Sequence, residues 1–304
     1  MQKLMKLLYK IIYHPTVNYI LRNFLKMSGK LLLKPIVISV SGKLKVTYKK
    51  HLFFLHTNQT CYVTKEIFYN GAENYEFTTL FEHLIKQSAI FFDVGANIGY
   101  FTVLGEKINP SVKIFSFEPS IGPLYYLNQN VKENFLKNST IIDKAVSDID
   151  GKLEFYDVIN EKYPWLKHNL NGSNSLQNKF GLIKSSSYLV DVTTLQSVIT
   201  NNDIKQIDLI KLDTECTEHL ILESSLGVIN KFQPIIICEV YDVIEKEVQE
   251  CIDKMTDYKL YHYIEATKKL NFISSLNEVT NDAYNRNFIF CPASKMDRLD
   301  GFIS

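Results

Sequence analysis

Residues 93–99 read Asp-Val-Gly-Ala-Asn-Ile-Gly and directly follow the apolar run 89–92. Gly95 permits a tight turn and Gly99 permits close packing of a helix against a strand, with Asn97 between them. A strand, such a loop and a helix together point backbone N–H groups and a helix N-terminus into one crevice. The segment therefore predicts a ligand-binding loop in an α/β fold.

The spacing of the glycines bears on which ligand this loop accepts. A dinucleotide-binding loop has the pattern G-x-G-x-x-G, which brings the backbone against a pyrophosphate. Here the glycines stand at 95 and 99, and Asp93 precedes Gly95 by two residues. A carboxylate in this place repels a diphosphate and attracts a cationic amino group. The loop disfavours NAD, although on its own it is weak evidence.

Short apolar runs alternate with helical patterns from about residue 88 onward. The runs occupy residues 89–94, 112–117, 140–142, 207–212 and 234–240. Strands this apolar are typical of a parallel sheet that helices cover on both faces, which predicts the α/β class. Ligands of such sheets bind beyond the carboxyl ends of the strands, so we expect the site at that edge.

An acidic residue stands at the end of the second of these runs. Phe117-Glu118-Pro119 lies nineteen residues beyond Gly99. A carboxylate at that strand end can accept hydrogen bonds from both hydroxyls of an adenosine ribose. The alternative is a loop acid that water solvates. We interpret Glu118 as a candidate nucleoside-binding residue.

The composition is that of an ordinary globular protein. The 304 residues are 46% apolar and 22% charged, which excludes a disordered chain, a collagen-like rod and a disulfide scaffold. The five cysteines form no C-x-x-C pair, so neither a zinc cage nor a disulfide framework is indicated. A reducing cytoplasm is the expected compartment.

The first part of the chain is strongly basic. Residues 1–65 contain twelve Lys or Arg and no acid. Residues 1–30 show apolar residues at helical spacing beside lysines, which predicts two amphipathic helices interrupted at Pro15. Charges break every apolar run, so neither helix is a membrane span or a signal peptide. Either the apolar stripe packs on the following domain, or the helices lie on an anionic membrane at its inner face.

The next segment has the character of short strands. Residues 36–40, 44–48 and 52–56 are rich in apolar and β-branched residues, with Ser41-Gly42 as the expected turn. We predict a small β-hairpin there. The predicted domains are residues 1–70, a helical and β-hairpin extension, and residues 71–304, the ligand-binding domain.

At this point the sequence resembles the FkbM-type family of S-adenosylmethionine-dependent methyltransferases. The resemblance covers roughly residues 66–291. It rests on ordered short pieces: Asp93–Thr102, Phe117–Pro119, Asn128 and Asn134, Lys144–Ser147 before Asp150-Gly151, Asn171–Leu176, Val192–Leu195, Leu209–Glu215 and Asn287–Pro292. Each piece is short, but their order and spacing together are specific.

The resemblance implies the class I methyltransferase (Rossmann-like) fold, with a seven-stranded sheet whose last strand is antiparallel. It implies S-adenosylmethionine as the cofactor. The expected cofactor-binding residues are Asp93, Gly95, Asn97 and Gly99 at the methionine end, Glu118 at the ribose, Asp143 and Ala145 at the adenine, and Asp213.

The sequence departs from the family pattern in two places. Asp213-Thr-Glu215-Cys216 stands where the family has Asp-x-Glu-Gly, and Leu195-Gln196 stands where it has Leu-Asp. A Cβ at Cys216 is expected to crowd the crevice. The departures leave an inactive relative open as an alternative.

Methyl transfer to a hydroxyl requires a group that takes the acceptor's proton. Asp213 and Glu215 are the candidate catalytic residues because they follow a buried strand; capping of the next helix is the alternative role. Glu239 and His219 are weaker candidates. The acids at 213, 215, 218 and 239 are also of the kind that holds Mg²⁺. Acids at strand and helix ends are common without metal, and no metal is expected.

The strand and helix pattern lapses between residues 157 and 189, where aromatic and small polar residues mix. Long inserts of this kind are often functional. We expect the insert to shape the acceptor pocket, with Trp165 and Asn174 as candidate substrate-binding residues. A surface excursion without function is the alternative.

The predicted function is O-methylation of a hydroxyl on a glycan or another small-molecule acceptor. No nucleic-acid partner is expected, because no such motif accompanies the basic residues. The alternatives are an NAD-dependent oxidoreductase and a non-catalytic or membrane-adaptor protein that keeps the fold.

Overall fold

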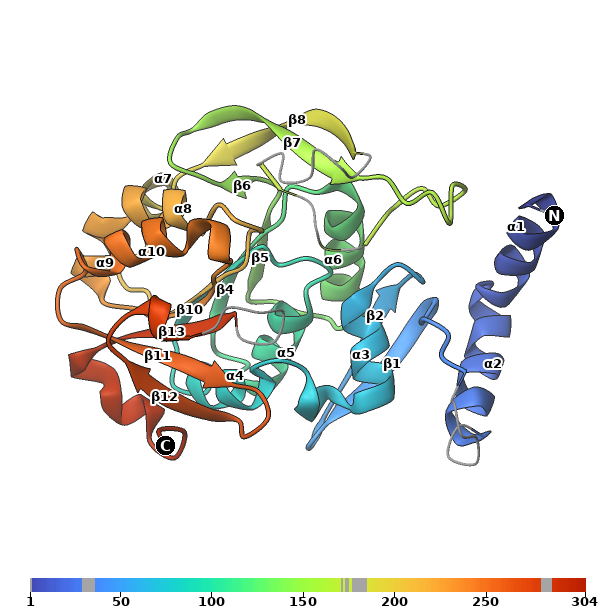
Figure 1. Ribbon diagram of the computed structural model, residues 1–304, viewed down its shortest axis with the longest axis horizontal. Coiled ribbons are helices and arrows are strands. Elements are labelled where there is room, and N and C mark those ends of the chain that lie inside the picture. Colours follow the sequence, from blue (N-terminus) through green and yellow to red (C-terminus); the bar gives the residue numbers. More distant parts are fainter. Residues whose placement is uncertain (1, 29–35, 171, 173–174, 177–184, 280–285) are drawn as a thin grey trace.

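The computed structural model describes residues 2–28, 36–170, 172, 175–176, 185–279 and 286–304. A large twisted sheet forms the centre of the molecule, and helices cover both of its faces (Figure 1). A hairpin and two N-terminal helices lie at one side of this body. The α/β class I methyltransferase architecture predicted from the sequence is confirmed.

The central sheet has eight strands within the described residues. Their order is β12 (Lys269–Ile273), β11 (Tyr258–Ile264), β13 (Asn287–Pro292), β10 (Ile235–Glu239), β9 (Leu209–Leu212), β3 (Ile90–Val94), β4 (Lys113–Phe117) and β5 (Ser139–Ile142). The five strands from β10 to β5 are parallel, and β13 is antiparallel to β10.

The prediction of seven strands was one short. Seven strands match the expected topology, and β12 adds an edge by pairing antiparallel with β11. The chain reverses between them at Lys268, which has a φ of +56°. Leu270 and Ile273 of β12 are buried in the two different hydrophobic clusters, so this edge strand packs on both faces of the sheet.

Alternate residues of the central strands enter two separate hydrophobic clusters. Phe91 of β3 belongs to the cluster that includes α4 (Thr78–Ile85) and α5 (Tyr100–Ile108). Its neighbour Phe92 belongs to the cluster on the other face, which four helices between residues 195 and 252 cover. These are α7 (Leu195–Asn201), α8 (Glu218–Ser224), α9 (Leu226–Phe232) and α10 (Glu245–Ile252). Burial on both faces explains why these strands are apolar without alternation.

A three-stranded sheet lies over the carboxyl edge of the central sheet. It consists of β6 (Ala145–Val146), β8 (Ser185–Thr193) and β7 (Gly151–Val158), with β7 antiparallel to β8 (Figure 1). α6 (Ile121–Glu133) follows β4 and precedes this layer in the chain. The segment in which the strand and helix pattern of the sequence lapses therefore lies between the end of β7 and the start of β8.

The predicted hairpin is present, but its turn lies elsewhere. β1 (Gly42–Tyr48) pairs with β2 (His51–Thr57), and the chain turns at Lys49, whose φ is +49°. Ser41 precedes β1 and Gly42 is its first residue, so the two do not link strands, and residues 36–40 form no strand. Pairing along the whole hairpin fixes the register and overrides the local turn signal.

Two asparagines, one within α6 and one at its C-terminal end, attach the hairpin to the main body. The backbone N–H of Phe54 donates to Asn134 Oδ1 at 2.9 Å, and Asn134 Nδ2 donates to the Phe54 carbonyl at 2.7 Å. Asn130 makes the same pair of contacts with His56, at 2.6 and 3.3 Å. The two amides thus satisfy the open edge of β2.

The extension and the main body share one core. Residues of the hairpin and of α3 (Tyr62–Asn70) lie in the same hydrophobic cluster as α4, α5 and β13. The domain boundary at residue 70 stays a prediction. α1 (Gln2–Ile12) and α2 (Pro15–Ser28) stand at the outer side of the hairpin (Figure 1). Of the helices described here, none combines the length and the apolar character that crossing a bilayer requires.

Candidate functional site

A cavity of about 590 Å³ opens at the carboxyl ends of β3, β4, β9 and β10. Its volume is in the range of pockets that hold a cofactor or a small substrate. The loops after these strands form its floor, and α3 with residues 74–76 forms another wall. This is the edge at which the sequence predicts the site.

The loop after β3 is held in place by β4. The N–H groups of Gly95 and Ala96 both donate to the carbonyl of Phe117, at 3.1 and 2.9 Å. Gly95 and Asn97 line the cavity, both at positive φ. Asn97 Oδ1 is buried and has no hydrogen-bond donor among the described residues. It is therefore an open acceptor for a ligand N–H or O–H group.

Gly99 serves packing instead of lining the cavity. A Cβ on this residue would lie 2.4 Å from Leu127 Cδ1 of α6. Gly99 has a φ of +83° and directly precedes α5. This agrees with close packing of α5, and Gly99 is not among the residues that line the cavity.

Glu118 lies at the end of β4, buried in the wall of the cavity. Its two carboxylate oxygens accept hydrogen bonds from the N–H groups of Asn97 at 2.8 Å and Ser120 at 2.9 Å. Burial raises the pKa of Glu118 to about 7, against the two backbone donors that favour its charged form. Each oxygen keeps a second lone pair for a ligand hydroxyl.

The wall next to Glu118 is apolar. Pro119, Ala145, Val146 and Phe155 line the cavity there. Such a surface suits a flat ring that needs little polar contact. Asp143 is exposed and does not line the cavity, so of the predicted pair only Ala145 reaches it.

Asp93 does not line the cavity, contrary to the sequence-based expectation. Its carboxylate is buried below the loop and accepts a hydrogen bond of 2.6 Å from Thr102 Oγ1. The cation nearest to it is Lys211 of β9, whose Nζ lies 3.8 Å from Asp93 Oδ1. Burial raises the pKa of Asp93, and Lys211 opposes that shift. The positive charge that Asp93 attracts is therefore that of Lys211, a residue of the protein, and not that of a ligand.

Lys211 connects three parts of the site. Its Nζ lies 3.0 Å from Asp213 Oδ2 and donates to the Gly95 carbonyl at 3.1 Å. Burial alone would lower the pKa of Lys211, but the charges of Asp213 and Asp93 raise it above its ordinary value. Lys211 is therefore charged, and it fixes the glycine loop to the end of β9.

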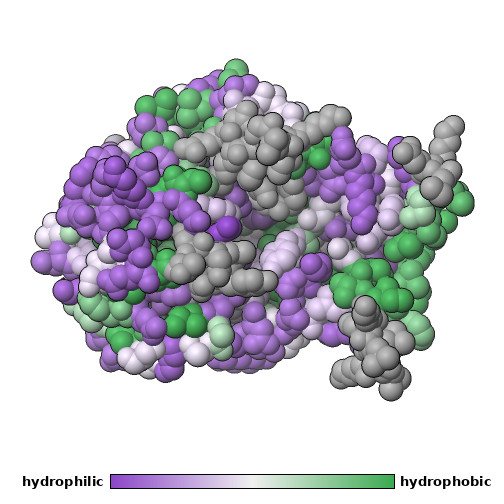
Figure 2. Space-filling model, viewed as in Figure 1, coloured by the Kyte–Doolittle hydropathy of each residue, from purple (hydrophilic) through white to green (hydrophobic). Residues whose placement is uncertain are grey.

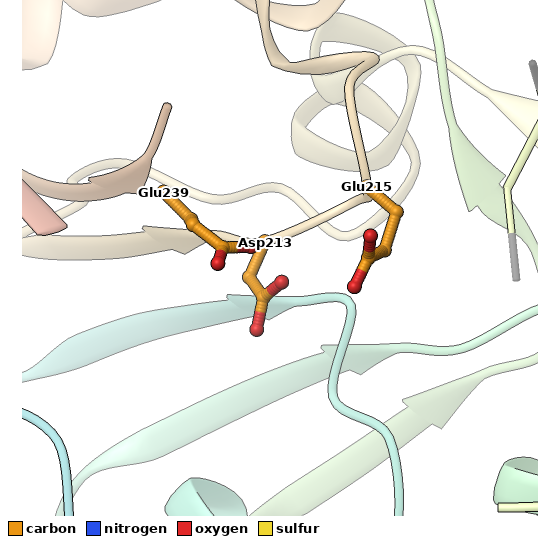
Figure 3. Close-up of side chains that lie close together, drawn as sticks. All are labelled: Asp213, Glu215 and Glu239. Carbon is orange, nitrogen blue, oxygen red and sulfur yellow. The ribbon is translucent and has the colours of Figure 1, made fainter. Parts of the chain in front are cut away.

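Three carboxylates converge on the other side of the cavity (Figure 3). One oxygen each of Asp213, Glu215 and Glu239 lies within 4.8 Å of the others. Burial and the charges of Asp213 and Glu215 raise the pKa of Glu239 well above its usual range. Acidic groups also gather in this way without metal, so the absence of a metal stays a prediction.

Two further groups accompany these carboxylates. The hydroxyl of Tyr241 donates to Glu215 Oε2 at 2.9 Å. Glu76 lines the cavity from the segment before α4, and burial, with a smaller contribution from Asp213, raises its pKa to about 7. The candidate catalytic residues Asp213 and Glu215 both line the cavity, among groups that hold or share protons near neutrality.

Cys216 does not crowd the crevice. Its side chain is buried in the hydrophobic cluster under α8, and it does not line the cavity. Its φ is +78°, and that of Glu215 is +62°. The glycine that the family pattern has here would relieve this backbone conformation. The departure from the family pattern at Cys216 therefore strains the backbone and does not block access to the cavity.

We expect Cys216→Val to lower the free energy of unfolding by about 2 kcal/mol, because a β-branched side chain is poorly tolerated at positive φ. The matched control is Cys238→Val in the extended strand β10, which is expected to cost less than about 1.5 kcal/mol. Urea unfolding measures both. Equal losses would show that strain at residue 216 is not the cause.

The predicted substrate-binding residues fare differently from the acids. Trp165 lies outside the cavity, with its ring 5.7 Å from that of Tyr163 and Lys10 Nζ 5.7 Å from its ring centroid. It packs against α1, so the insert turns this aromatic residue toward the N-terminal helices. Asn174 lies outside the described residues. Leu170 and Leu176 of the same insert do line the cavity.

Sequence reasoning gave no role to several residues that line or support the site. These are Glu66 of α3, Tyr75, Glu76, Lys211, Glu265, Arg286 and Asn287. Lys211 carried a signal, because a lysine within the otherwise apolar segment 209–212 requires a buried partner. The residues before β3 carried none, since only the packing of α3 brings them to the cavity.

The sequence and fold were compared with known proteins. Residues 93–272 match the family model described as Methyltransferase FkbM domain, which is more than half of the 304 residues. No curated protein matches the sequence.

Among solved structures, the chain is similar to methyltransferase FkbM from Methylobacillus flagellatus KT, with 15% identity and a TM-score of 0.43 over 76% of this chain and 54% of that one. It thus spans about half the length of that protein. It is also similar to M. jannaschii TYW2 in complex with AdoMet, with 13% identity and a TM-score of 0.39 over 84% of this chain and 87% of that one. A third is a SAM-dependent O-methyltransferase from Thermotoga maritima, with 12% identity and a TM-score of 0.37 over 70% and 63% of the two chains.

These structural similarities concern the fold alone. The family follows from the match over residues 93–272. The chain belongs to the FkbM methyltransferase family.

Proposed function

We propose that the protein binds S-adenosylmethionine in the cavity and transfers its methyl group to a hydroxyl of a small-molecule or glycan acceptor. The observation that carries the proposal is the division of the cavity. Buried Glu118 and an apolar wall lie at one end, and a cluster of carboxylates lies at the other.

The residues present fit this cofactor. Glu118 is the proposed partner of the ribose hydroxyls, and Ala145 and Phe155 form the proposed wall for the adenine ring. Asn97 Oδ1 is an acceptor without a donor among the described residues. When bound, the cofactor supplies an activated methyl group on a positively charged sulfur. Asp213 is already paired with Lys211, and Glu215 in the same cluster is a further carboxylate that favours a cation in its vicinity.

The charge of the cavity supports an acceptor that is not an anion. Among the described residues that line it, seven side chains are acidic and two, Lys144 and Arg286, are basic. A phosphate group would meet this excess of carboxylates, whereas sugar hydroxyls can donate hydrogen bonds to them. Asp213 and Glu215 are the proposed acceptors of the hydroxyl proton.

A direct test measures binding and turnover separately. Calorimetry with S-adenosylhomocysteine is expected to give saturable heat, and NAD none. A methyl-transfer assay then compares neutral glycans with phosphorylated glycans and with RNA, and transfer is expected only to the neutral acceptors. Binding without transfer to any of them would leave a non-catalytic protein, and transfer to RNA would contradict the charge argument.

Glu118→Gln is expected to weaken S-adenosylhomocysteine binding by about tenfold to a hundredfold. The variant loses a charge-assisted hydrogen bond and turns an amide N–H₂ toward the backbone donors of Asn97 or Ser120. Calorimetry gives the affinity. Glu250→Gln, at an exposed position of α10, is the matched control and should bind as the unmodified protein does. Unchanged affinity in Glu118→Gln would remove Glu118 from the site.

A further inference from the structure

The helices α1 and α2 expose the side that helices normally bury. Large apolar side chains point to solvent along both helices, and Figure 2 shows a hydrophobic edge at this place. The exposed residues are Leu4, Met5, Leu7, Leu8 and Ile11 of α1, and Tyr19, Ile20, Phe24 and Met27 of α2. Packing of the apolar stripe on the following domain, one of the two sequence-based alternatives, is therefore wrong for these residues.

The residues of α2 that are fully buried against the body are polar. Asn18 and Arg22 are buried there, one helical turn apart. Asn18 Nδ2 donates to the Ser39 carbonyl at 3.0 Å, and its Oδ1 accepts from the Ser41 N–H at 2.8 Å. Arg22 donates to the carbonyls of Ser41 at 3.2 Å and Lys43 at 2.9 Å, and to Asn18 Oδ1 at 3.1 Å.

This network fixes how α2 is rotated. A rotation that buried Ile20 or Phe24 would break the contacts of Asn18 and Arg22 and leave the backbone polar groups of residues 39–43 without them. α1 is held by aromatic contacts, with the rings of Tyr9 and Tyr13 at 5.6 and 5.4 Å from that of Tyr163. These contacts therefore keep the apolar side of both helices facing away from the body.

The charged residues of α1 and α2 themselves are all basic. Lys6 and Lys10 are exposed next to the stripe of α1, and residues 1–65 contain no acid. A second copy of the chain placed on this surface would bring its own lysines against these. An anionic phospholipid surface offers negative charge and an apolar interior together.

We infer that the apolar side of α1 and α2 binds an anionic membrane surface, with the helices lying in the plane of the interface. Leu4, Leu7 and Ile11, with Ile20 and Phe24, enter the boundary between headgroups and acyl chains, and the lysines remain at the headgroups. This inference does not depend on the proposed methyl transfer.

The test uses the full chain with three exposed side chains changed. Ile20→Ser/Phe24→Ser/Met27→Ser removes apolar area at positions that are 62%, 64% and 76% exposed. The matched control, Phe135→Ser/Leu189→Ser/Val243→Ser, changes residues that are 84%, 68% and 74% exposed elsewhere. Sedimentation with phosphatidylglycerol vesicles measures the bound fraction. The partition coefficient of the first variant is expected to fall by about tenfold or more, and that of the control to stay unchanged.

Three further measurements separate the possible occupants of the surface. Binding to phosphatidylcholine vesicles, and binding to anionic vesicles at high salt, are expected to be weaker. The protein is expected to be monomeric by light scattering without vesicles. Failure to bind anionic vesicles, equal binding by the triple variant, or a dimer that only the triple variant dissociates would each overturn the inference.

Discussion

Gly95→Ala is expected to lower the free energy of unfolding by about 3 kcal/mol or more and to abolish measurable binding of S-adenosylhomocysteine. A Cβ at residue 95 would lie 1.8 Å from the carbonyl oxygen of Asp213, which no side chain can do without a backbone shift. The backbone at Asp213 cannot yield easily, because its N–H donates to the carbonyl of Val94 at 3.2 Å. The loop must move away from β4 and β9, and the cavity loses its floor.

A second glycine separates this clash from the cost of positive φ. Gly301 has a φ of +82°, close to the +75° of Gly95, but a Cβ there meets nothing within 4 Å. Gly301→Ala should cost about 1 kcal/mol and leave ligand binding unchanged. Thermal unfolding and calorimetry measure both variants. Similar losses for the two would mean that the contact with Asp213 relaxes freely.

The sequence predicted the central strands because burial on both faces makes them continuous apolar runs, as at Phe91 and Phe92. β12 was missed for the opposite reason. It is an edge strand in which buried Leu270 and Ile273 flank two exposed residues, so no run appears. The turn at Lys49 was missed because its positive φ is imposed by hairpin pairing, whereas Ser41-Gly42 has the composition of a turn.

The amphipathic pattern of α1 and α2 was visible, but the side that faces the body was not. A periodic stripe tells which residues share a side, and it says nothing of what that side meets. Arg22 and Asn18 bond to backbone carbonyl and amide groups of residues 39–43, which become neighbours only after folding. Sequence spacing holds no record of such contacts.

The candidate site was predicted where strand ends define it. Gly95, Glu118 and Asp213 follow apolar strands, and topology brings their ends together. Asp93 is different, because a strand residue alternates between faces and proximity to the loop does not fix where its carboxylate points. Trp165 shows the same limit for an insert, since aromatic composition predicts contact with some surface without identifying α1 as that surface.

Lys211→Met is expected to destabilise the protein by about 3–5 kcal/mol. The substitution keeps most of the side-chain volume but leaves the carboxylate of Asp93 buried without its cation, and it frees Asp213 from its partner at 3.0 Å. The Gly95 carbonyl also loses a donor. Urea unfolding at neutral pH measures the loss of stability, and calorimetry measures the accompanying loss of ligand binding.

Two conditions identify charge as the cause. Asp93→Asn/Lys211→Met removes both buried charges and keeps an oxygen for Thr102, so it should recover part of the lost stability. Lowering the pH should also recover part of the stability that Lys211→Met loses. In Lys211→Met the native pKa of Asp93 rises further above its unfolded value, so the folded state binds more protons and stability falls as pH rises between these two values. The deficit should therefore be smaller at pH 5 than at pH 8. A deficit independent of pH, with no recovery in the double variant, would instead assign the loss to packing against Phe101, whose ring centroid lies 5.8 Å from Lys211 Nζ.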